Sequence, residues 1–416
     1  LDAVTLGWIT TAYLLAASVC ILPFGKIADI YGRKRFFLIG NILFAIGSLC
    51  AAVSVSGAML ITSRIIQGLG GAMVFATSVA IITIVFAPGE RGRAIGIITA
   101  TVYAGLSLGP VLGGFLTQHF GWPSIFLFNI PIALLVIILT LTSVHGDWRE
   151  KAEHRFDKTG LLLYALTLTG CMYGLSTLPL LTGFVFVGAG FGCGLIFIWW
   201  EKKQKNPFLE LTIFQSNRTF LFSNIAAMIN YSVVFAVSLL VSLLLQYNRG
   251  LDPATAGLIL LAQPLVQTFV SPVAGHLSDT VDPGIIATVG MGLTAVGLIL
   301  LMISLPAQPI LIITFGLAVL GLGYGLFSSP NTNAIMSSVD SHYLGLASGM
   351  VSTMRAIGQL ISLAITMMVF SVIIGTVQIT PDVYDQLLSS TLVIFGIFTV
   401  LSILGIYTSY TRGPVR

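Results

Sequence analysis

Thirteen long apolar runs constrain this chain more than any other feature. A run of about 20 mostly apolar residues is long enough to cross a bilayer as a helix. Only 8% of the 416 residues are charged, whereas soluble domains carry about 25%. Because the alternating pattern of a membrane β-barrel is also absent, we expect an all-α membrane protein. The expected spans are at about 6–24, 36–56, 59–86, 93–117, 124–144, 160–176, 181–200, 219–246, 254–278, 284–304, 309–335, 344–374 and 388–409.

Basic residues are distributed unevenly among the loops between these runs. If the turn at 26–35 faces the cytoplasm and the sides alternate from there, sixteen Lys or Arg residues lie inside. Only Arg249 then lies outside, while Arg64 and Arg355 fall within apolar runs. Such an excess of bases is typical of cytoplasmic loops. The pattern predicts a multi-pass protein of the cytoplasmic (inner) membrane, and the net charge of +4 indicates loop orientation and not nucleic-acid binding.

The turn after the first apolar run has a distinctive composition, with glycines that permit a tight turn and one acid among several bases. Its residues are Gly25, Lys26, Asp29, Gly32, Arg33, Lys34 and Arg35. This pattern resembles the signature G-x-x-x-D-x-x-G-R-[KR]-[KR], which the major facilitator superfamily carries after its second membrane span. The resemblance implies a secondary transporter built as a helical bundle.

The same resemblance implies that this turn belongs to a cytoplasmic gate that stabilises the outward-facing state. Asp29 would pair with Arg33 and with the bases of the next inside loop, Arg91 and Arg93. Asp279 would be the counterpart of Asp29 in the second half of the chain. The simpler alternative is a basic loop that only sets topology, and both roles can hold together.

The chain also repeats itself. Gly25 and Asp29 recur as Gly275 and Asp279, and a second series recurs at an offset of 253, in which Gly68 and Gly70 match Gly321 and Gly323. A series on nearly one offset indicates two homologous halves, as in the major facilitator fold, which binds substrate between its halves. Two extra apolar runs lie between the halves. We therefore expect an N-terminal bundle at 1–144, a linker with two extra spans at 145–218 and a six-span bundle at 219–416.

Six, two and six spans, less one, resemble the fourteen-span drug:proton antiporter family. Because both ends of such proteins face the cytoplasm, the odd span count leads us to expect a first span upstream of Leu1. Local phrases such as Asn206-Pro-Phe-Leu-Glu-Leu211 resemble the same family, and the resemblance covers the whole chain.

Arg64 lies inside the third apolar run, with Gln67 one turn away on the same face. A charge at membrane depth costs several kcal/mol on most scales and marks a functional site by default. Snorkelling of the side chain to the outer headgroups is the alternative. The match to the family's fourth-span motif implies that Arg64 faces the central cavity and takes part in proton coupling, because a fixed cation lowers the pKa of a neighbouring carboxyl group.

A second motif occupies the fourth apolar run, where small residues alternate with a proline. Its residues are Gly105, Gly109, Pro110, Gly113 and Gly114. Glycines four apart allow close helix packing, and proline bends a helix. Ordinary small-residue packing would explain the pattern without any statement about transport. Its resemblance to the fifth-span antiporter motif instead implies export by exchange, with this helix forming a contact surface between the halves.

Several polar or aromatic residues within the other runs are candidates for a substrate cavity. They are Trp8, Tyr13, Asn230, Tyr231, Gln263, Gln267, Asn331, Asn333 and Gln359. Hydrogen bonding between helices is an equally good explanation for those in the second half, and Trp8 is also well placed as an interfacial anchor. Arg355 is either a partner in the cytoplasmic gate or a snorkelling cation.

Every acid falls in a loop or at the end of a span. Proton coupling needs a titrating group near the midplane, and the family pattern places an acid in the first span. We therefore expect the coupling acid upstream of Leu1. The four cysteines (Cys20, Cys50, Cys171 and Cys193) lack metal-ligand spacing and are expected to be packed thiols without a metal or disulfide.

These observations predict a proton-coupled antiporter that exports small amphipathic compounds or drugs by alternating access. The expected partners are a small-molecule substrate, protons and the bilayer, with no nucleic acid and no cofactor. No nucleotide-binding loop is present and no catalytic constellation is expected, so the chain is not predicted to be an enzyme. Family resemblance implies a monomer. A dedicated transporter of a sugar, organic anion or siderophore is the alternative, and a non-transporting sensor or scaffold is a remote one.

Overall fold

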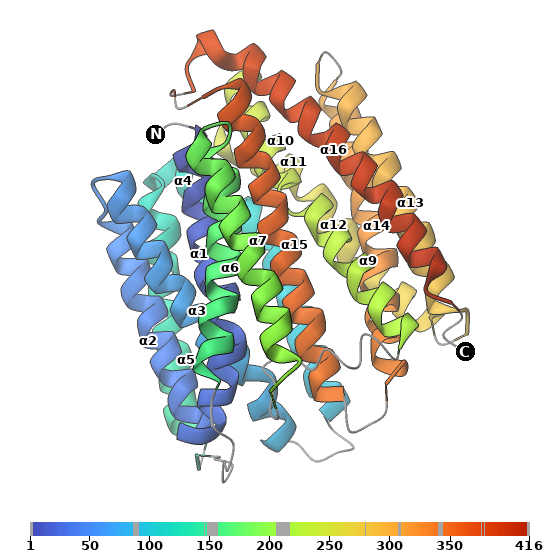
Figure 1. Cartoon of the computed structure of the whole chain (residues 1–416). Helices are drawn as coiled ribbons and strands as arrows, with labels where there is room; N and C mark the ends of the chain where they lie inside the picture. Colours follow the sequence, from blue (N-terminus) through green and yellow to red (C-terminus); the bar gives the residue numbers. More distant parts are fainter. Residues whose placement is uncertain are drawn as a thin grey trace. The chain divides into compact units, whose positions relative to one another are not determined.

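Helices are the only regular secondary structure among the described residues of the computed structural model (Figure 1). The predicted all-α class is therefore confirmed. Helical segments lie in each of the thirteen predicted apolar runs, and the runs at 219–246 and 254–278 each contain more than one segment. Within the described residues, 11 helical segments are long and apolar enough to cross a membrane, and Thr5–Ile21 is a shorter apolar helix. The structure describes residues 3–85, 91–144, 146–147, 157–204, 217–278, 280–306, 309–339, 344–375, 377 and 379–413.

The polypeptide forms two compact units. Unit 1 comprises Leu1–Thr101 and Leu116–Glu210, and unit 2 comprises Val102–Phe115 and Leu211–Arg416. Helix α4 (Arg91–Phe120) contributes to both. The two extra helices between the halves of the sequence belong to unit 1. Besides α4, the helices of unit 1 are α1 (Ala3–Tyr31), α2 (Arg33–Ala52), α3 (Gly57–Val85), α5 (Pro123–Ser143) and the two extra helices α6 (Lys158–Thr177) and α7 (Leu181–Glu201).

Glycines set the closest helix contacts of unit 1. Helix α3 packs against both α1 and α2, and α5 packs against α2. A Cβ atom on Gly40 would lie 2.9 Å from the carbonyl oxygen of Gly70, and one on Gly47 would lie 2.6 Å from the backbone nitrogen of Gln67. These positions leave no room for a larger residue, because the α2 and α3 backbones are in direct contact.

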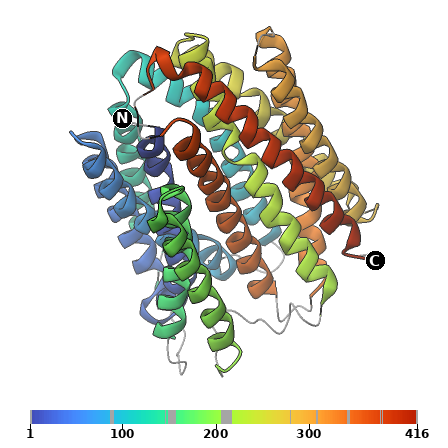
Figure 2. The same ribbon diagram turned by 45° about the horizontal axis from the view of Figure 1, so that its top comes forward.

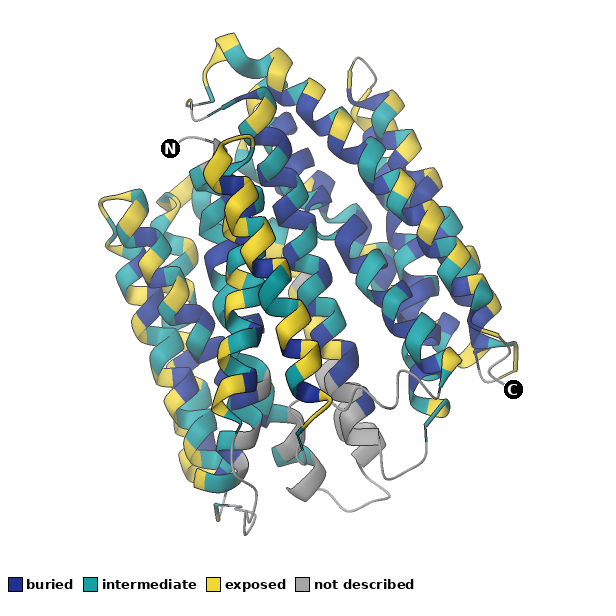
Figure 3. Cartoon of the chain, in the orientation of Figure 1, coloured by how far each residue is buried: buried dark blue, intermediate teal, exposed yellow. Residues whose placement is uncertain are grey.

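The extra helices α6 and α7 form a hairpin that rests on α1. A Cβ atom on Gly170 would lie 3.0 Å from the Cα atom of Gly190, so glycines also mediate this contact. The Tyr164 hydroxyl donates to the carbonyl oxygen of Ser18 on α1 (3.4 Å). Figure 3 shows many exposed residues along α6 and α7, and several are large and apolar, such as Leu181 and Phe184. This composition suits a surface that faces lipid.

Unit 2 contains the second half of the sequence. Its helices and turns are α9 (Arg218–Val234), α10 (Val237–Leu243), the π-helix η1 (Leu244–Asn248), α11 (Pro253–Leu260), α12 (Ala262–Leu277), α13 (Pro283–Ser304), α14 (Ile310–Ser337), α15 (Leu344–Ile373), the 3₁₀ turn η3 (Pro381–Val383) and α16 (Tyr384–Thr411). Helix α13 lies beside α14 and α16 (Figure 2). Ala226, Ala287, Met291 and Phe327 form a buried core between α9, α13 and α14.

The glycine contacts of unit 1 recur in unit 2. A Cβ atom on Gly290 would lie 2.7 Å from the carbonyl oxygen of Gly323. This matches unit 1, where a Cβ atom on Gly40 would lie 2.9 Å from the carbonyl oxygen of Gly70. Gly68 meets the carbonyl oxygen of Tyr13, and Gly321 meets that of Gln263. These pairs lie at the offsets of about 250 residues in the sequence repeat. The repeat therefore corresponds to equivalent helix crossings in the two units.

Helix α4 also makes a close contact within unit 2. A Cβ atom on Gly114 would lie 2.3 Å from the carbonyl oxygen of Pro253, at the start of α11. One on Gly257, a turn further along α11, would lie 2.3 Å from the carbonyl oxygen of Pro110. At Gly105, Gly109 and Gly113 a Cβ atom would meet nothing within 4 Å. The contact thus depends on one glycine of the motif and on one glycine of α11.

A buried arginine at the end of α16 connects several helices of unit 2. Arg412 is 1% exposed, and its Nη1 donates to Ser223 Oγ on α9 (3.1 Å) and to Asn331 Oδ1 on α14 (2.8 Å). Its Nε donates to the carbonyl oxygen of Ser409 (2.7 Å). Burial lowers the pKa of Arg412 to about 10, and the Asp282 carboxylate opposes this shift. Arg412 therefore remains a cation at neutral pH and connects three helices.

We predict that Arg412→Met destabilises the protein. The substitution leaves Ser223 Oγ and Asn331 Oδ1 without their donor, and each buried polar group that loses its partner costs about 1–3 kcal/mol. Thermal unfolding of the purified protein in detergent measures the change. Arg218→Met is the matched control, because Arg218 lies at the same end of unit 2 but is exposed. Equal stability of the two variants would contradict the assigned role of Arg412.

A second prediction compares neighbouring glycines of α4. Alanine favours a helix over glycine by about 1 kcal/mol, so Gly113→Ala should be neutral or slightly stabilising. Gly114→Ala should destabilise the protein and reduce transport, because its Cβ atom collides with the Pro253 carbonyl group. Thermal unfolding and a transport assay on both variants test this difference. If both variants behave alike, the close approach of α4 to α11 is wrong.

Candidate functional site

The first candidate site is built around Arg64 within unit 1. Its Nε donates to the carbonyl oxygen of Ile9 on α1 (3.0 Å), and its Nη1 donates to Gln67 Oε1. The guanidinium carbon lies 4.5 Å from the ring centre of Tyr13 and 5.8 Å from that of Phe126 on α5. A guanidinium at these distances is attracted to the ring faces. Three helices therefore fix the position of one membrane-embedded cation.

Gln67 extends this network to a third polar residue. It is 1% exposed, and its Nε2 donates to Ser48 Oγ on α2 (2.8 Å). Gln67 also lies where α2 and α3 are closest, because the Gly47 position faces its backbone. Arg64 and Gln67, which the sequence places one turn apart on the same helix face, are joined in the structure by a direct hydrogen bond.

The equivalent crossing in unit 2 shows that the fold does not need this network. The repeat pairs Arg64, Gln67 and Ser48 with Leu317, Leu320 and Leu298. These three leucines are fully buried, and Leu320 faces Gly297 as Gln67 faces Gly47. The same backbone contact is therefore made in unit 2 with apolar side chains alone. Because polar groups at membrane depth are costly, the polar set of unit 1 is a candidate functional site.

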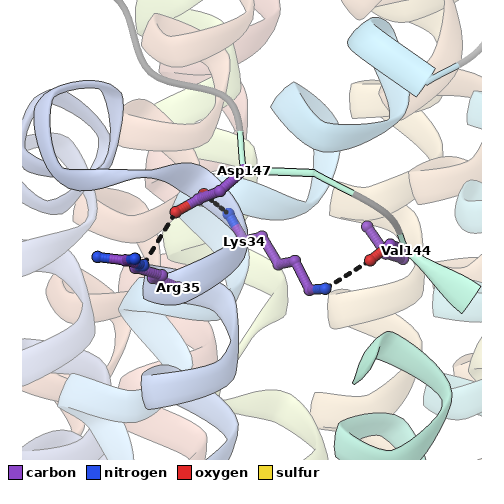
Figure 4. Close-up of polar contacts among 4 residues, drawn as sticks. All are labelled: Lys34, Arg35, Val144 and Asp147. Carbon is purple, nitrogen blue, oxygen red and sulfur yellow. Dashed lines mark hydrogen bonds and ion pairs between the residues drawn. The ribbon is translucent and has the colours of Figure 1, made fainter. Parts of the chain in front are cut away.

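The basic turn forms a second charged cluster, shown in Figure 4. Asp147 lies beyond the end of α5, and its Oδ2 forms an ion pair with Arg35 Nε (3.2 Å). Its Oδ1 accepts from the backbone N–H of Lys34 in the first turn of α2 (3.2 Å). The Lys34 ammonium donates to the carbonyl oxygen of Val144. An acid at a helix N-terminus also interacts favourably with the helix dipole.

Gly32 makes this arrangement possible. It has a φ angle of 113°, which L side chains rarely adopt. A Cβ atom there would lie within 2.6 Å of the Asp147 carboxylate. Gly32, which precedes the bases of the sequence motif, is thus the residue against which the Asp147 carboxylate lies.

Asp147 is a functional candidate that the sequence analysis missed, and Arg412 is another. Helix α5 packs on α2, and α16 packs on α13 in the same way. Asp147 lies over Gly32 at the start of α2, and Arg412 lies against Gly284 at the start of α13. The signs are reversed, because Asp282 is the acid that faces Arg412. A charged residue just after the last helix of each half is the signal that would have identified both.

Other expected gate residues are only partly visible. The backbones of Asp29, Arg91 and Arg93 are helical, but their side chains, and the whole of Asp279, lie outside the described residues. A Cβ atom built on Gly25 would meet no described atom within 4 Å. The pairing of Asp29 with these bases therefore stays a prediction.

The polar candidates of unit 2 separate into two groups. Tyr231 joins α14 and α15, because its ring lies 5.6 Å from that of Tyr324 and 5.0 Å from the Arg355 guanidinium. Three buried amides have side-chain atoms that meet no hydrogen-bond partner within the described part of the chain: both polar atoms of Asn230, Gln263 Oε1 and Gln267 Nε2. Such atoms are unusual in a protein interior and suit a role in ligand binding.

The remaining cavity candidates make other contacts; they are Asn331, Asn333, Gln359 and Trp8. Asn331 accepts from Arg412 and donates to the carbonyl oxygen of Ser223 (3.1 Å), and Asn333 donates to Ser278 Oγ (2.9 Å). Gln359 is half-buried on α15. The Trp8 ring lies 6.3 Å from that of Tyr173 on α6. Trp8 therefore connects α1 to the extra hairpin, and Tyr13 connects α1 to Arg64.

Comparisons with known proteins place the chain in a family. A family model described as Major Facilitator Superfamily matches residues 1–363 and 220–415. Multidrug resistance protein Stp of Mycobacterium tuberculosis (strain CDC 1551 / Oshkosh) is 35% identical over 367 residues, which cover 86% of this chain and 68% of that protein. Riboflavin transporter RibZ of Clostridioides difficile is 33% identical and covers 84% of this chain and 76% of its own.

Further similarity extends to an export protein and to solved structures. The tetracenomycin C resistance and export protein of Streptomyces glaucescens is 28% identical, covering 91% of this chain and 71% of that protein. The crystal structure of the peptide transporter POT has a TM-score of 0.69 at 15% identity, covering 99% of this chain and 87% of the other, which shows the same fold. The chain therefore belongs to the Major Facilitator Superfamily of membrane transporters.

Proposed function

We propose that this transporter exports small amphipathic compounds by proton-coupled antiport. The Arg64 network carries the proposal, because it is a polar device at membrane depth that the equivalent crossing of unit 2 lacks. The relatives named for multidrug resistance and for tetracenomycin C export support the direction of transport. The glycine motif of α4, which resembles that of antiporters, supports exchange.

In the proposed mechanism, Arg64 couples the substrate to the proton. The groups that the structure places around its guanidinium are a carbonyl group, an amide and two aromatic rings, none of them acidic. A cation in this environment attracts electron-rich groups and lowers the pKa of a carboxyl group brought near it. A substrate that occupies the rings or the amide changes this attraction. Where such a carboxyl group carries the proton, its proton binding is linked to substrate binding at the rings or the amide, as exchange requires.

The charged cluster that follows α5 is proposed to act as a gate. In a gate of this kind, an alternating-access transporter breaks and remakes contacts at one side of the membrane during each cycle. The ion pair between Arg35 and Asp147 suits this role, because Arg35 is 67% exposed and water can replace the contact. Arg412 suits a permanent tie instead, since it is buried among three helices.

A dedicated metabolite transporter is the second candidate, and one comparison favours it. The riboflavin transporter at 33% identity shows that a named metabolite is the substrate of one relative. The unpartnered amides Asn230, Gln263 and Gln267 would give hydrogen bonds to a defined polar substrate. A site with several fixed hydrogen-bonding groups discriminates strongly between similar molecules.

Proton flux in vesicles that contain the full-length protein distinguishes these functions. Lipophilic cations, neutral drugs, organic anions and riboflavin are added in turn under a pH gradient. Proton movement triggered by several unrelated amphiphiles supports the drug antiporter. A response to one chemical class indicates a dedicated transporter. Substrate movement without proton movement would contradict the proposed coupling.

We predict that the double variant Arg64→Leu, Gln67→Leu folds but loses coupled transport. It copies the residues Leu317 and Leu320 of the equivalent crossing in unit 2, where both are fully buried. Substrate-driven proton flux should fall at least about 10-fold, which corresponds to about 1.4 kcal/mol or more of lost coupling. Thermal unfolding should show an intact fold. Flux at the wild-type level would refute the role assigned to Arg64.

The proposed gate gives a further prediction about Asp147. Asp147→Asn should slow transport several-fold, because it weakens both the ion pair to Arg35 and the contact to the start of α2. Arg35→Gln should have a smaller effect, since exposed ion pairs contribute only about 0.2–1 kcal/mol. A double-mutant cycle on transport rates measures the coupling of the two residues. Strictly additive effects would show that the ion pair does not act in the cycle.

A further inference from the structure

Each helix of the extra hairpin carries an exposed apolar strip that ends at a lysine. The strip on α6 consists of Lys158, Leu162 and Leu166, and the strip on α7 consists of Leu195, Trp199 and Lys203. Residues four apart share one face of a helix, which makes each strip continuous. Lys203 lies just beyond the end of α7, and its ammonium is 3.6 Å from the ring centre of Trp199. Both helices therefore present apolar surface next to an exposed base.

The two lysines lie at the same end of the hairpin. Asp157, which precedes Lys158, accepts a hydrogen bond from Trp200 Nε1 near the end of α7 (3.0 Å). A Cβ atom on Gly160 would lie 2.7 Å from Glu201 Oε1, so the first turn of α6 is packed against the last turn of α7. The exposed bases at this end, which we call the basic end, are Lys158, Lys202 and Lys203.

Acids and bases are segregated at the basic end. Glu201 is only 2% exposed. Asp157 is half-buried, and its carboxylate accepts from the backbone N–H of Gly160 (2.9 Å) as well as from Trp200. The three lysines are exposed, and within the described part of the chain none of them forms an ion pair. The accessible surface at this end is therefore positive, although two acids lie close by.

We propose that the basic end and the two strips bind an anionic phospholipid. The lysines contact its phosphate, and its acyl chains lie along the exposed apolar residues of the strips. Exposed bases beside a membrane attract acidic head groups, whereas a zwitterionic head group neutralises its own phosphate. Trp199 is 55% exposed next to Lys203, and tryptophan is typical of the head-group level of a membrane. The hairpin thus selects a lipid by charge in addition to facing the bilayer.

Helix α13 offers a reference surface in the same protein. Ile285 and Val289 are exposed, apolar and four residues apart, as in the strips of the hairpin. The residues that lead into this helix, 280–284, include the acid Asp282 and no base. This surface should therefore contact lipid without a preference for anionic head groups.

Photoactivatable lipids test the proposal at the level of single peptides. The full-length protein is reconstituted in phosphatidylcholine vesicles that contain a small fraction of phosphatidylglycerol or of phosphatidylcholine, each with the same diazirine-bearing acyl chain. After illumination, labelled peptides are mapped by mass spectrometry. We expect phosphatidylglycerol to label peptides 158–166 and 195–203 at least about three-fold more than phosphatidylcholine does. The peptide that contains Ile285 and Val289 should be labelled equally by both. The same ratio in all three peptides would indicate ordinary contact with lipid and would overturn the site.

Charge variants test whether the lysines act locally. Replacing all three lysines of the basic end with Gln should lower the labelling ratio of the strips to that of the α13 peptide, which also reports whether the variant is correctly embedded. Lys203→Gln alone should lower the ratio in part. Arg218→Gln is its matched control, because Arg218 is another exposed base that lies over an aromatic ring, and it should leave the ratio unchanged. An unchanged ratio in the triple variant, or an equal fall in the two single variants, would overturn the proposal.

Discussion

Direct backbone contact between helices at glycine positions is the constraint on which the rest of the structure depends. In unit 1, Gly40 and Gly47 bring α2 against α3, and in unit 2, Gly290 and Gly297 bring α13 against α14. Lipid offers no hydrophobic driving force for helix association, so such close packing supplies much of the cohesion in a membrane. The crossings fix where every other side chain can point. Arg64 and Gln67 reach Ser48 and the Ile9 carbonyl group because α1, α2 and α3 are already held together.

The duplicated architecture also separates what is structural from what is functional. Two crossings with the same backbone contacts carry different side chains: Arg64, Gln67 and Ser48 in one, and three leucines in the other. The apolar version shows what packing alone requires. The polar version carries an added cost of burial, and a transporter that binds polar or charged groups offers a reason for that cost. In a protein with two homologous halves, the equivalent position in one half thus serves as a control for an unusual residue in the other.

Much of the fold was predictable from the sequence, because hydropathy and length determine membrane helices almost directly. The apolar runs, the all-α class and the repeat offsets all appear in the structure. The site was predictable only where a residue breaks a strong local rule, as Arg64 does within an apolar run. Asp147 and Arg412 follow helices as ordinary loop charges would, and only the tertiary contacts over Gly32 and Gly284 set them apart. The π-helix η1 has no sequence pattern of its own and became visible only in the structure.

The reversed signs of the two clusters that follow α5 and α16 have a consequence for how such proteins diverge. Asp147 contacts the start of α2 in one half, and Arg412 lies near Asp282 at the start of α13 in the other. Both members of each cluster lie in the same half, so a change of sign at one position can be compensated by a second change close by in the fold. Each half can therefore change the signs of its own cluster without a compensating change in the other half. From this arrangement we expect correlated substitutions within a half and not between halves.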